Sequence, residues 1–240
     1  MKLLQPHERI LVALDVDTID AAVGLVQALS GKVGGFKVGL ELVNAVGFDI
    51  FPRLMDVGAG RIFYDAKFHD IPNTVAGAVR AAAKRGVWML NVHTSGGAEM
   101  LQSARDAAHT VETPPLMIGV TVLTSIDEAT LHRDLRVTEG LPAHVEHLAK
   151  LAKTSGMDGV VAAPQELKTI RAACGSDFIT VIPGVRPAGT ALNDQKRVAT
   201  PAQAITDGAD YLVIGRAITA ASDPTSAVDA IVAEIQAVVL

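Results

Sequence analysis

One short segment of the sequence alternates carboxylates with ammonium groups, a combination that supplies a fixed electrostatic field and a proton donor. Asp65 and Lys67 stand two residues apart, so in an extended chain their side chains project to the same side. Asp70 follows three residues after Lys67, and Lys37 lies earlier in the chain, within the mostly apolar run Gly35–Gly39. If the four groups meet, each charge favours the charged form of its opposite neighbour. The spacing therefore predicts a Lys–Asp–Lys–Asp array with both acids ionised and both lysines protonated.

A structural salt bridge at a strand end is the simpler interpretation, and a single Asp–Lys pair would favour it. Four charges at the ends of two neighbouring strands favour a catalytic site instead. Burying so many charges costs free energy, which a function in catalysis would account for. Asp15 adds a further carboxylate, directly after the apolar run Leu11-Val12-Ala13-Leu14.

Two later segments have the composition of an anion-binding site. Pro183-Gly184-Val185-Arg186-Pro187 and Gly215-Arg216 each follow a short apolar run. Glycine allows the backbone to approach a ligand closely, and arginine supplies charge-assisted hydrogen-bond donors. A solvated surface arginine is the alternative for each segment. Two such arginines, in the loops where barrel enzymes commonly hold phosphate, favour a phosphate site.

These residues need elements that bring them together, and the sequence alternates short β-branched runs with alanine-rich stretches of helical period. The predicted strands are Ile10–Asp15, Gly35–Gly39, Arg61–Asp65, Val87–Val92, Leu116–Val122, Gly159–Ala162, Phe178–Ile182 and Tyr211–Ile214. The predicted helices are Ile19–Leu29, Glu41–Val57, Thr74–Arg85, Ala98–Ala108, Pro142–Ser155, Pro164–Ala173, Pro201–Asp207 and Thr225–Val238.

Eight strand–helix alternations without a linker predict one domain, residues 1–240, folded as a (β/α)8 TIM barrel. In such a barrel the carboxyl ends of the strands converge on one face, where active sites are built. A doubly wound open sheet is the rival fold. It is disfavoured in its dinucleotide-binding form because no G-x-G-x-x-G turn follows the first strand. Gly184–Ala199 lacks apolar periodicity and is expected to be a ligand-binding loop after the seventh strand.

The overall composition sets limits on partners and location. The 240 residues are 49% hydrophobic and carry a formal net charge of −5, so we expect no general attraction to nucleic acid or to anionic membranes. The sequence has no signal-like segment and no apolar run long enough to span a bilayer. The single cysteine, Cys174, excludes an internal disulfide, and we expect a cytoplasmic protein.

At the charged residues the sequence resembles the orotidine 5′-monophosphate decarboxylase family. The family pattern D-x-K-x-x-D-I-x-x-T stands here as Asp65-Ala66-Lys67-Phe68-His69-Asp70-Ile71-Pro72-Asn73-Thr74. Further matches in family order are Ala13-Leu14-Asp15, Phe36-Lys37-Val38-Gly39, Val120-Thr121-Val122-Leu123-Thr124-Ser125, Pro183-Gly184-Val185-Arg186-Pro187 and Ile214-Gly215-Arg216. The resemblance therefore covers nearly the whole chain.

The resemblance implies conversion of orotidine 5′-monophosphate to uridine 5′-monophosphate by a homodimer, with neither a metal nor an organic cofactor. It implies that Lys67 protonates the pyrimidine carbon that loses its carboxylate, and that Asp65 lies against the departing group. The resemblance also implies that Lys37 and Asp15 bind the ribose, and that Thr124 and Ser125 contact the pyrimidine edge. Asp70 and Thr74 would reach into the active site of the partner subunit. The residues implied around the phosphate are Pro183, Arg186, Gln195, Gly215 and Arg216.

Three alternatives remain at this point. A related barrel enzyme uses a similar D-x-K-x-x-D motif to bind Mg²⁺ and acts on sugar phosphates as a decarboxylase or aldolase. The Ile71–Thr74 extension and the Gly-Val-Arg-Pro loop argue against that enzyme. A barrel that binds phosphorylated metabolites without catalysis is the second alternative. A zinc site built on His69 and His93 is the third, and it is disfavoured because their spacing is not ligand-like.

Overall fold

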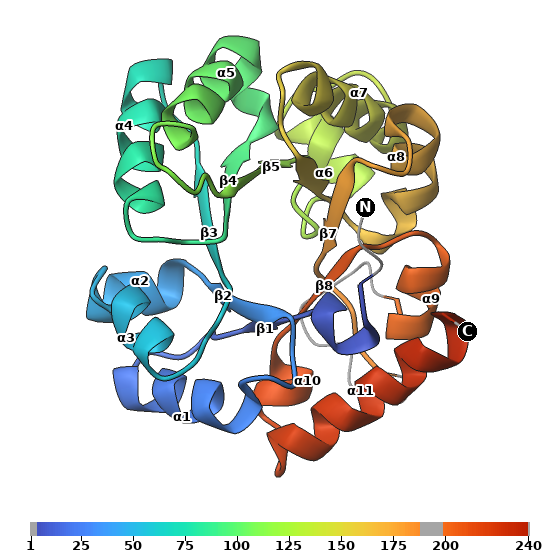
Figure 1. The fold of residues 1–240 in the computed structure, drawn as a ribbon. Helices are drawn as coiled ribbons and strands as arrows, with labels where there is room; N and C mark the ends of the chain where they lie inside the picture. The colour runs from blue at the N-terminus through green and yellow to red at the C-terminus, as the bar shows by residue number, and fades with distance from the viewer. Residues whose placement is uncertain (1–3, 188–198, 240) are drawn as a thin grey trace.

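The short branched-aliphatic runs form eight parallel strands that pair in sequence order and close into a barrel (Figure 1). The computed structural model describes residues 4–187 and 199–239. Closure occurs where β8 pairs with β1, with Leu11 opposite Val213. The strands are β1 (Ile10–Ala13), β2 (Gly35–Val38), β3 (Ile62–Phe68), β4 (Met89–His93), β5 (Leu116–Val120), β6 (Gly159–Val161), β7 (Ile179–Ile182) and β8 (Tyr211–Ile214). The predicted (β/α)8 barrel is confirmed.

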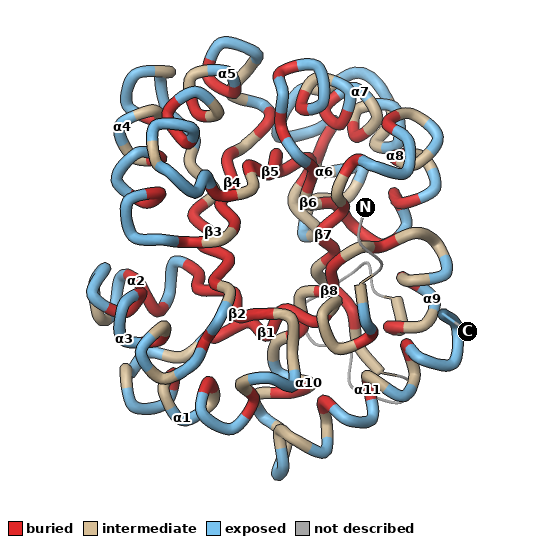
Figure 2. The backbone as a smooth tube through the Cα atoms, in the orientation of Figure 1, coloured by how far each residue is buried: buried red, intermediate tan, exposed pale blue. Residues whose placement is uncertain are grey.

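Helices surround the barrel and bury one face each against the strands, as the red inner and pale blue outer segments of Figure 2 show. The α-helices are α1 (Ile19–Leu29), α2 (Leu40–Val46), α3 (Ile50–Asp56), α4 (Pro72–Ala83), α5 (Gly97–Ala108), α6 (Glu128–Arg133), α7 (Leu141–Thr154), α8 (Leu167–Cys174), α9 (Pro201–Thr206), α10 (Arg216–Thr219) and α11 (Pro224–Val239). Three 3-10 turns, η1 (Pro6–Arg9), η2 (Thr94–Gly96) and η3 (Pro164–Glu166), complete the described elements.

Most predicted boundaries are correct to within one or two residues, but two predictions were wrong. The predicted helix Glu41–Val57 is two helices, α2 and α3, because Gly47 takes a positive φ of 81° that an α-helix does not accommodate. The predicted strand Arg61–Asp65 continues to Phe68 as β3, so Lys67 lies within the strand instead of after it. The short helices α6 and α10 were not predicted.

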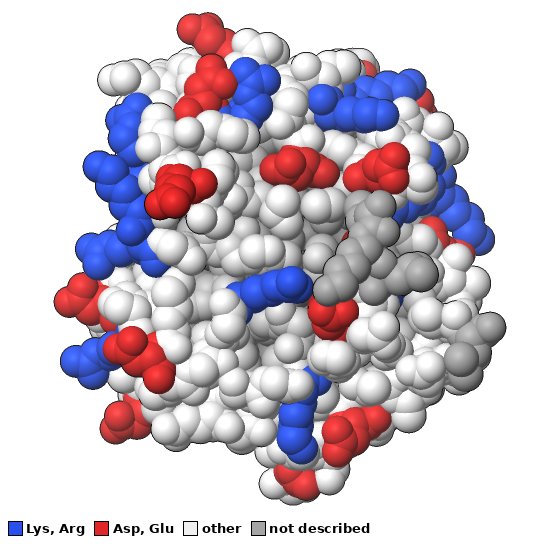
Figure 3. All heavy atoms as spheres, viewed as in Figure 1, with Lys and Arg blue, Asp and Glu red and all other residues white. Residues whose placement is uncertain are grey.

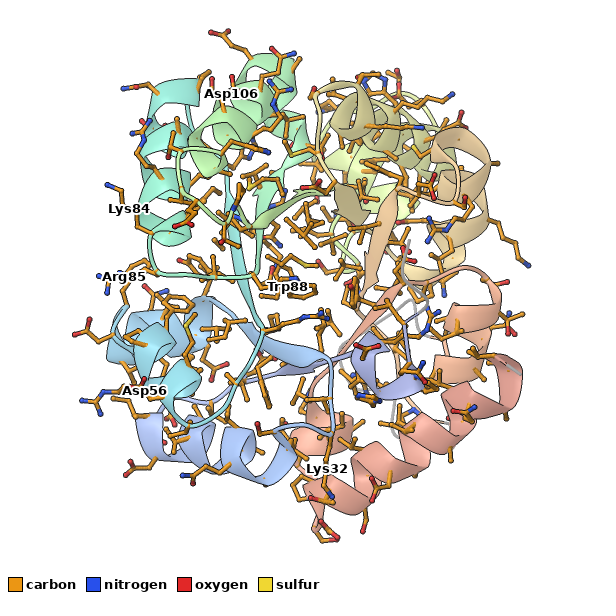
Figure 4. All side chains as sticks on the ribbon, viewed as in Figure 1. Lys32, Asp56, Lys84, Arg85, Trp88 and Asp106 are labelled. Atoms are coloured by element: carbon orange, nitrogen blue, oxygen red, sulfur yellow. The ribbon has the colours of Figure 1, made fainter. Side chains whose placement is uncertain are left out.

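Alternate residues of each strand face the barrel interior, and those near the start of the strands are apolar. Near the start of the strands Leu11, Phe63, Met89, Ile118 and Val181 pack together in the interior, with Tyr211 completing the cluster. Trp88, just before β4, packs against this cluster and lies near the middle of the view in Figure 4. The outward residues pack against the helices in the larger core. The end of the barrel at the start of the strands is therefore filled with apolar side chains.

The outer surface carries charges of both signs. Acidic and basic side chains are interspersed around the edge of the face seen in Figure 3. Among the described residues, no helix combines the length and the apolar character that crossing a bilayer requires.

Candidate active site

A cavity of about 130 Å³ opens at the carboxyl ends of the strands, at the opposite end of the barrel from Trp88. Phe63, Val161 and Val213 line it and also pack against the interior cluster, so they form its floor. Asp65, Lys67 and Thr124 bring polar groups to it, and the remaining lining residues are Val120, Val122, Leu123, Ala162 and Pro183. The cavity is thus largely apolar, with its charges gathered on β3, as is usual for small-molecule sites.

Four charged side chains from three adjacent strands form a continuous chain beside this cavity. Asp15 follows β1, and its Oδ1 lies 2.5 Å from the Nζ of Lys37 on β2. The same Nζ lies 3.9 Å from Asp65 Oδ2, and Asp65 Oδ1 lies 2.6 Å from Lys67 Nζ. Opposite charges alternate along the order Asp15–Lys37–Asp65–Lys67, so the group is electrically balanced. The predicted meeting of Lys37, Asp65 and Lys67 is confirmed.

The charge state of Asp65 follows from two opposing effects. Burial acts to raise the pKa of its carboxyl, since desolvation disfavours the charged form. The positive charges of Lys67 and Lys37 and hydrogen bonds from Lys67 and Asn91 lower the pKa by more, so it falls below its usual value of 3.8. Asp65 is therefore ionised at neutral pH.

The backbone of Lys67 is strained, and sequence reasoning missed the residue that holds it. Lys67 has a φ of 51°, in the left-handed region, which costs about 1–2 kcal/mol for a residue other than glycine. Its N–H donates to Asn91 Oδ1 at 2.7 Å, and Asn91 Nδ2 donates to Asp65 Oδ1 at 2.7 Å. Asn91 is fully buried on β4. A single amide within the apolar run Met89–His93 was the signal that could have revealed it.

Gly39 makes room for the ammonium group of Lys37. A Cβ at this position would lie 3.0 Å from Lys37 Nζ and 3.8 Å from Asp15 Oδ1. Lys37 is only 7% exposed, so its ammonium has little alternative space. The glycine that ends the run Gly35–Gly39 therefore belongs to the site.

Among the described residues, neither Asp70 nor Thr74 forms an ion pair or hydrogen bond with the array. Asp70 precedes α4, which begins at Pro72. The Asp70 carboxylate accepts a hydrogen bond from the Ile71 N–H at 2.7 Å. Asp70, Ile71 and Thr74 are all exposed, and Ile71 is 67% exposed despite its large apolar side chain. In place of Asp70, the fourth member of the array within the chain is Asp15.

The remaining predicted residues are distributed around the same end of the barrel. Thr124 and Pro183 line the cavity, whereas Ser125 is exposed and outside its lining. A Cβ on Gly215 would lie 3.6 Å from Asp15 Oδ2, so the end of β8 adjoins the array.

The two arginines that were predicted to bind phosphate each follow a strand, at the carboxyl end of the barrel. Arg186 follows β7, where its N–H donates to Ala199 O at 3.0 Å, and Arg216 begins α10 directly after Gly215. Gln195 and most of the predicted loop Gly184–Ala199 lie outside the described residues.

The two histidines of the zinc hypothesis lie together, with ring centroids 5.4 Å apart. Burial lowers the pKa of His93, and the nearby positive charges of His69 and Lys67 lower it further. Within residues 4–187 and 199–239, no group of three or more His, Cys, Asp or Glu side chains is arranged to hold a metal ion. Among these described residues, the histidine pair therefore has none of the further ligands that a zinc site requires.

Comparison with known proteins shows a single consistent relationship. Residues 8–231 match the model of the family described as "Orotidine 5'-phosphate decarboxylase / HUMPS family". The chain is 51% identical to the orotidine 5′-phosphate decarboxylase of Moorella thermoacetica over 240 residues, covering 98% of this chain and 95% of the relative. It is 44% identical to that of Heliobacterium modesticaldum, covering 97% of each chain. The crystal structure of orotidine 5′-phosphate decarboxylase from Lactobacillus acidophilus superposes with a TM-score of 0.83 at 38% identity, covering 94% of this chain and 98% of that one.

Proposed function

The chain belongs to the orotidine 5′-phosphate decarboxylase / HUMPS family, and we propose that it is a carboxy-lyase that converts orotidine 5′-monophosphate to uridine 5′-monophosphate and CO2 in pyrimidine biosynthesis. The observation that carries the proposal is the Asp15–Lys37–Asp65–Lys67 array beside the cavity. The decarboxylase names of the relatives favour this reaction over a sugar-phosphate reaction. We assign residues 1–240 to one catalytic domain. The single free, buried cysteine supports a reducing compartment, the cytoplasm.

The chemistry requires stabilisation of a carbanion that has no delocalising partner. Loss of CO2 leaves an electron pair in the plane of the pyrimidine ring. An ammonium group fixed beside that carbon stabilises the developing charge and then transfers its proton to the carbon. Lys67 is the donor in this proposal, because its Nζ is held at the cavity by Asp65. A metal or organic cofactor is not required, since the ammonium supplies both the positive charge and the proton.

The other side chains of the site bind the substrate in our proposal. Asp15 and Lys37 hold the ribose hydroxyls, and Thr124, with Ser125 beside it, contacts the pyrimidine. Its place in the cavity lining makes Thr124 the better supported of the two. Pro183, Arg186, Gln195, Gly215 and Arg216 surround the phosphate. Binding energy from this remote phosphate contributes to positioning at the reacting carbon.

We further propose a homodimer in which Asp70 and Thr74 complete the site of the partner subunit. Support comes from exposed apolar side chains at the rim of the site, at the carboxyl ends of β2 and β3. Leu40 is 53% exposed and Ile71 is 67% exposed. Large apolar side chains gathered at one surface are typical of protein–protein contacts. Asp70 and Thr74 flank Ile71, so a subunit covering this surface would meet both of them.

The test is the loss of orotidine 5′-monophosphate absorbance with purified protein. We expect turnover that persists in EDTA and that falls by much more than tenfold in Lys67→Ala. Activity abolished by EDTA and restored by Mg²⁺ would favour the sugar-phosphate alternative. Turnover by Lys67→Ala within tenfold of wild type would show that the proposed proton donor is wrong.

A further inference from the structure

Asn91 contacts both members of the Asp65–Lys67 pair, and we propose that it is a positioning residue for the decarboxylation. In this role it fixes the Lys67 backbone and the Asp65 carboxylate together, so that the ammonium group stays aimed at the reacting carbon. The inference rests on the proposed function, because that function assigns the proton transfer to Lys67. Asn91 itself does not line the cavity among the described residues, so it acts through its two neighbours.

The first contact secures an irregular stretch of backbone. Tyr64 lies opposite Leu90 and Phe68 lies opposite Val92, so β3 advances four residues while β4 advances two. Lys67 lies in this bulge with its left-handed φ of 51°. Its N–H donates to the side-chain oxygen of Asn91, which lies between Leu90 and Val92. An apolar side chain at position 91 would leave this N–H unpaired and the bulge free to relax.

The second contact orients the carboxylate without adding charge. Asp65 Oδ1 accepts from Lys67 Nζ at 2.6 Å and from Asn91 Nδ2 at 2.7 Å. These two donors direct Oδ1 away from Lys37, so Oδ2 is the oxygen that lies 3.9 Å from Lys37 Nζ. A cation at position 91 would compete with Lys67 for the carboxylate, and an anion would repel it. Only a neutral side chain with both a donor and an acceptor serves both neighbours.

Two variants distinguish a positioning role of Asn91 from a role in packing alone. Asn91→Leu has a similar size and no hydrogen-bonding groups. We expect its kcat to fall about 100-fold, as a misplacement of about 1 Å can produce. KM should change less than about threefold, because the side chain of Asn91 hydrogen-bonds to Lys67 and Asp65, neither of which is assigned to the phosphate or the pyrimidine.

Asn91→Asp keeps an acceptor for Lys67 N–H but places a carboxylate oxygen where the amide nitrogen now lies 2.7 Å from Asp65 Oδ1. Two carboxylates at that distance raise the pKa of one of them. The acid limb of the kcat–pH profile should therefore move to higher pH. A residue that only fills space would not move this limb.

Thr94→Val is the matched control, since Thr94 is also fully buried at this end of β4 and its hydroxyl has no hydrogen-bond partner among the described residues. Its kcat and pH profile should equal those of wild type. With an active wild type, a kcat within threefold in a folded Asn91→Leu, or an unshifted acid limb in Asn91→Asp, overturns the positioning role alone. If Asn91→Leu does not fold, the acid limb of Asn91→Asp decides. An inactive wild type contradicts the proposed function, and the positioning role falls with it.

Discussion

Asp65→Asn tests whether the charge of Asp65, rather than its shape, holds the array together. The substitution keeps the size of the side chain and one oxygen acceptor, but it removes the negative charge between Lys37 and Lys67. Asp65 is mostly buried, with 16% of its side chain exposed, so water screens these contacts only weakly. We expect both stability and turnover to fall.

The size of the stability loss follows from the distances. Unit charges 2.6 Å apart, as for Asp65 Oδ1 and Lys67 Nζ, attract by about 6 kcal/mol at an effective dielectric constant of about 20. The 3.9 Å separation from Lys37 adds about 4 kcal/mol before desolvation is subtracted. Losing one partner of a buried pair has a net cost of about 3–5 kcal/mol. Lys67 is 30% exposed and Lys37 keeps Asp15, so we expect the lower end, about 3 kcal/mol.

Urea denaturation of wild type and Asp65→Asn at several pH values measures this loss. The folded-state pKa of Asp65 is lowered, so its contribution is fully present at pH 7 and is lost as the pH falls below 3.8 through the folded pKa. The two unfolding free energies should therefore differ by about 3 kcal/mol at pH 7 and converge in acid. With Lys67 no longer anchored, kcat should fall about 100-fold or more.

Asp49→Asn is the control, because Asp49 pairs with Arg85 at 3.5 Å on an exposed surface and should contribute less than about 1 kcal/mol. A stability difference below about 1 kcal/mol for Asp65→Asn at pH 7, or one that is the same at pH 3 and pH 7, would refute the electrostatic account.

Two further predictions concern the same site. In Gly39→Ala the new methyl group lies 3.0 Å from Lys37 Nζ, so kcat/KM should fall about tenfold with a small change in Tm. Gly24→Ala is the control: its added Cβ meets nothing within 4 Å, so its kinetics should equal those of wild type. Equal kinetics for the two variants would contradict the role of Gly39. Separately, mixing inactive Lys67→Ala and Asp70→Ala subunits should restore about a quarter of wild-type activity, because half of the dimers carry one intact shared site. No recovery in heterodimers shown to form by native mass spectrometry would contradict site sharing.

The barrel could be predicted from the sequence because its determinants are local. Alternating β-branched runs and alanine-rich helices are visible in the order of residues, and eight repeats of them permit few other folds. The break between α2 and α3 was missed because a lone glycine inside an apolar stretch is compatible with one helix or two. Only the packing of Ile50, Phe51 and Leu54 against the core decides that a second helix begins after Gly47.

The charged residues of the site could be predicted because charges at strand ends are conspicuous in a mostly apolar sequence. Their connection could not be read in full, because it depends on tertiary contacts. Asp15 joins Lys37 across neighbouring strands, and Asn91 joins Asp65 across a bulge that no local pattern indicates. The prediction that Asp65 and Lys67 share one side used ordinary extended geometry. The contact is real, yet Lys67 reaches it from a left-handed backbone.

That backbone conformation explains how an ammonium group can be both strongly paired and available for reaction. A lysine in regular extended geometry on β3 would follow the strand pleat, whereas the turn at Lys67 is set by the hydrogen bond from its N–H to Asn91. The strain is offset by contacts that fix the side chain at both ends, Asn91 at the backbone and Asp65 at Nζ. In the proposed reaction, with both ends fixed, little reorganisation is needed when a carbanion forms beside Nζ, and a charge that is already in place stabilises it most effectively.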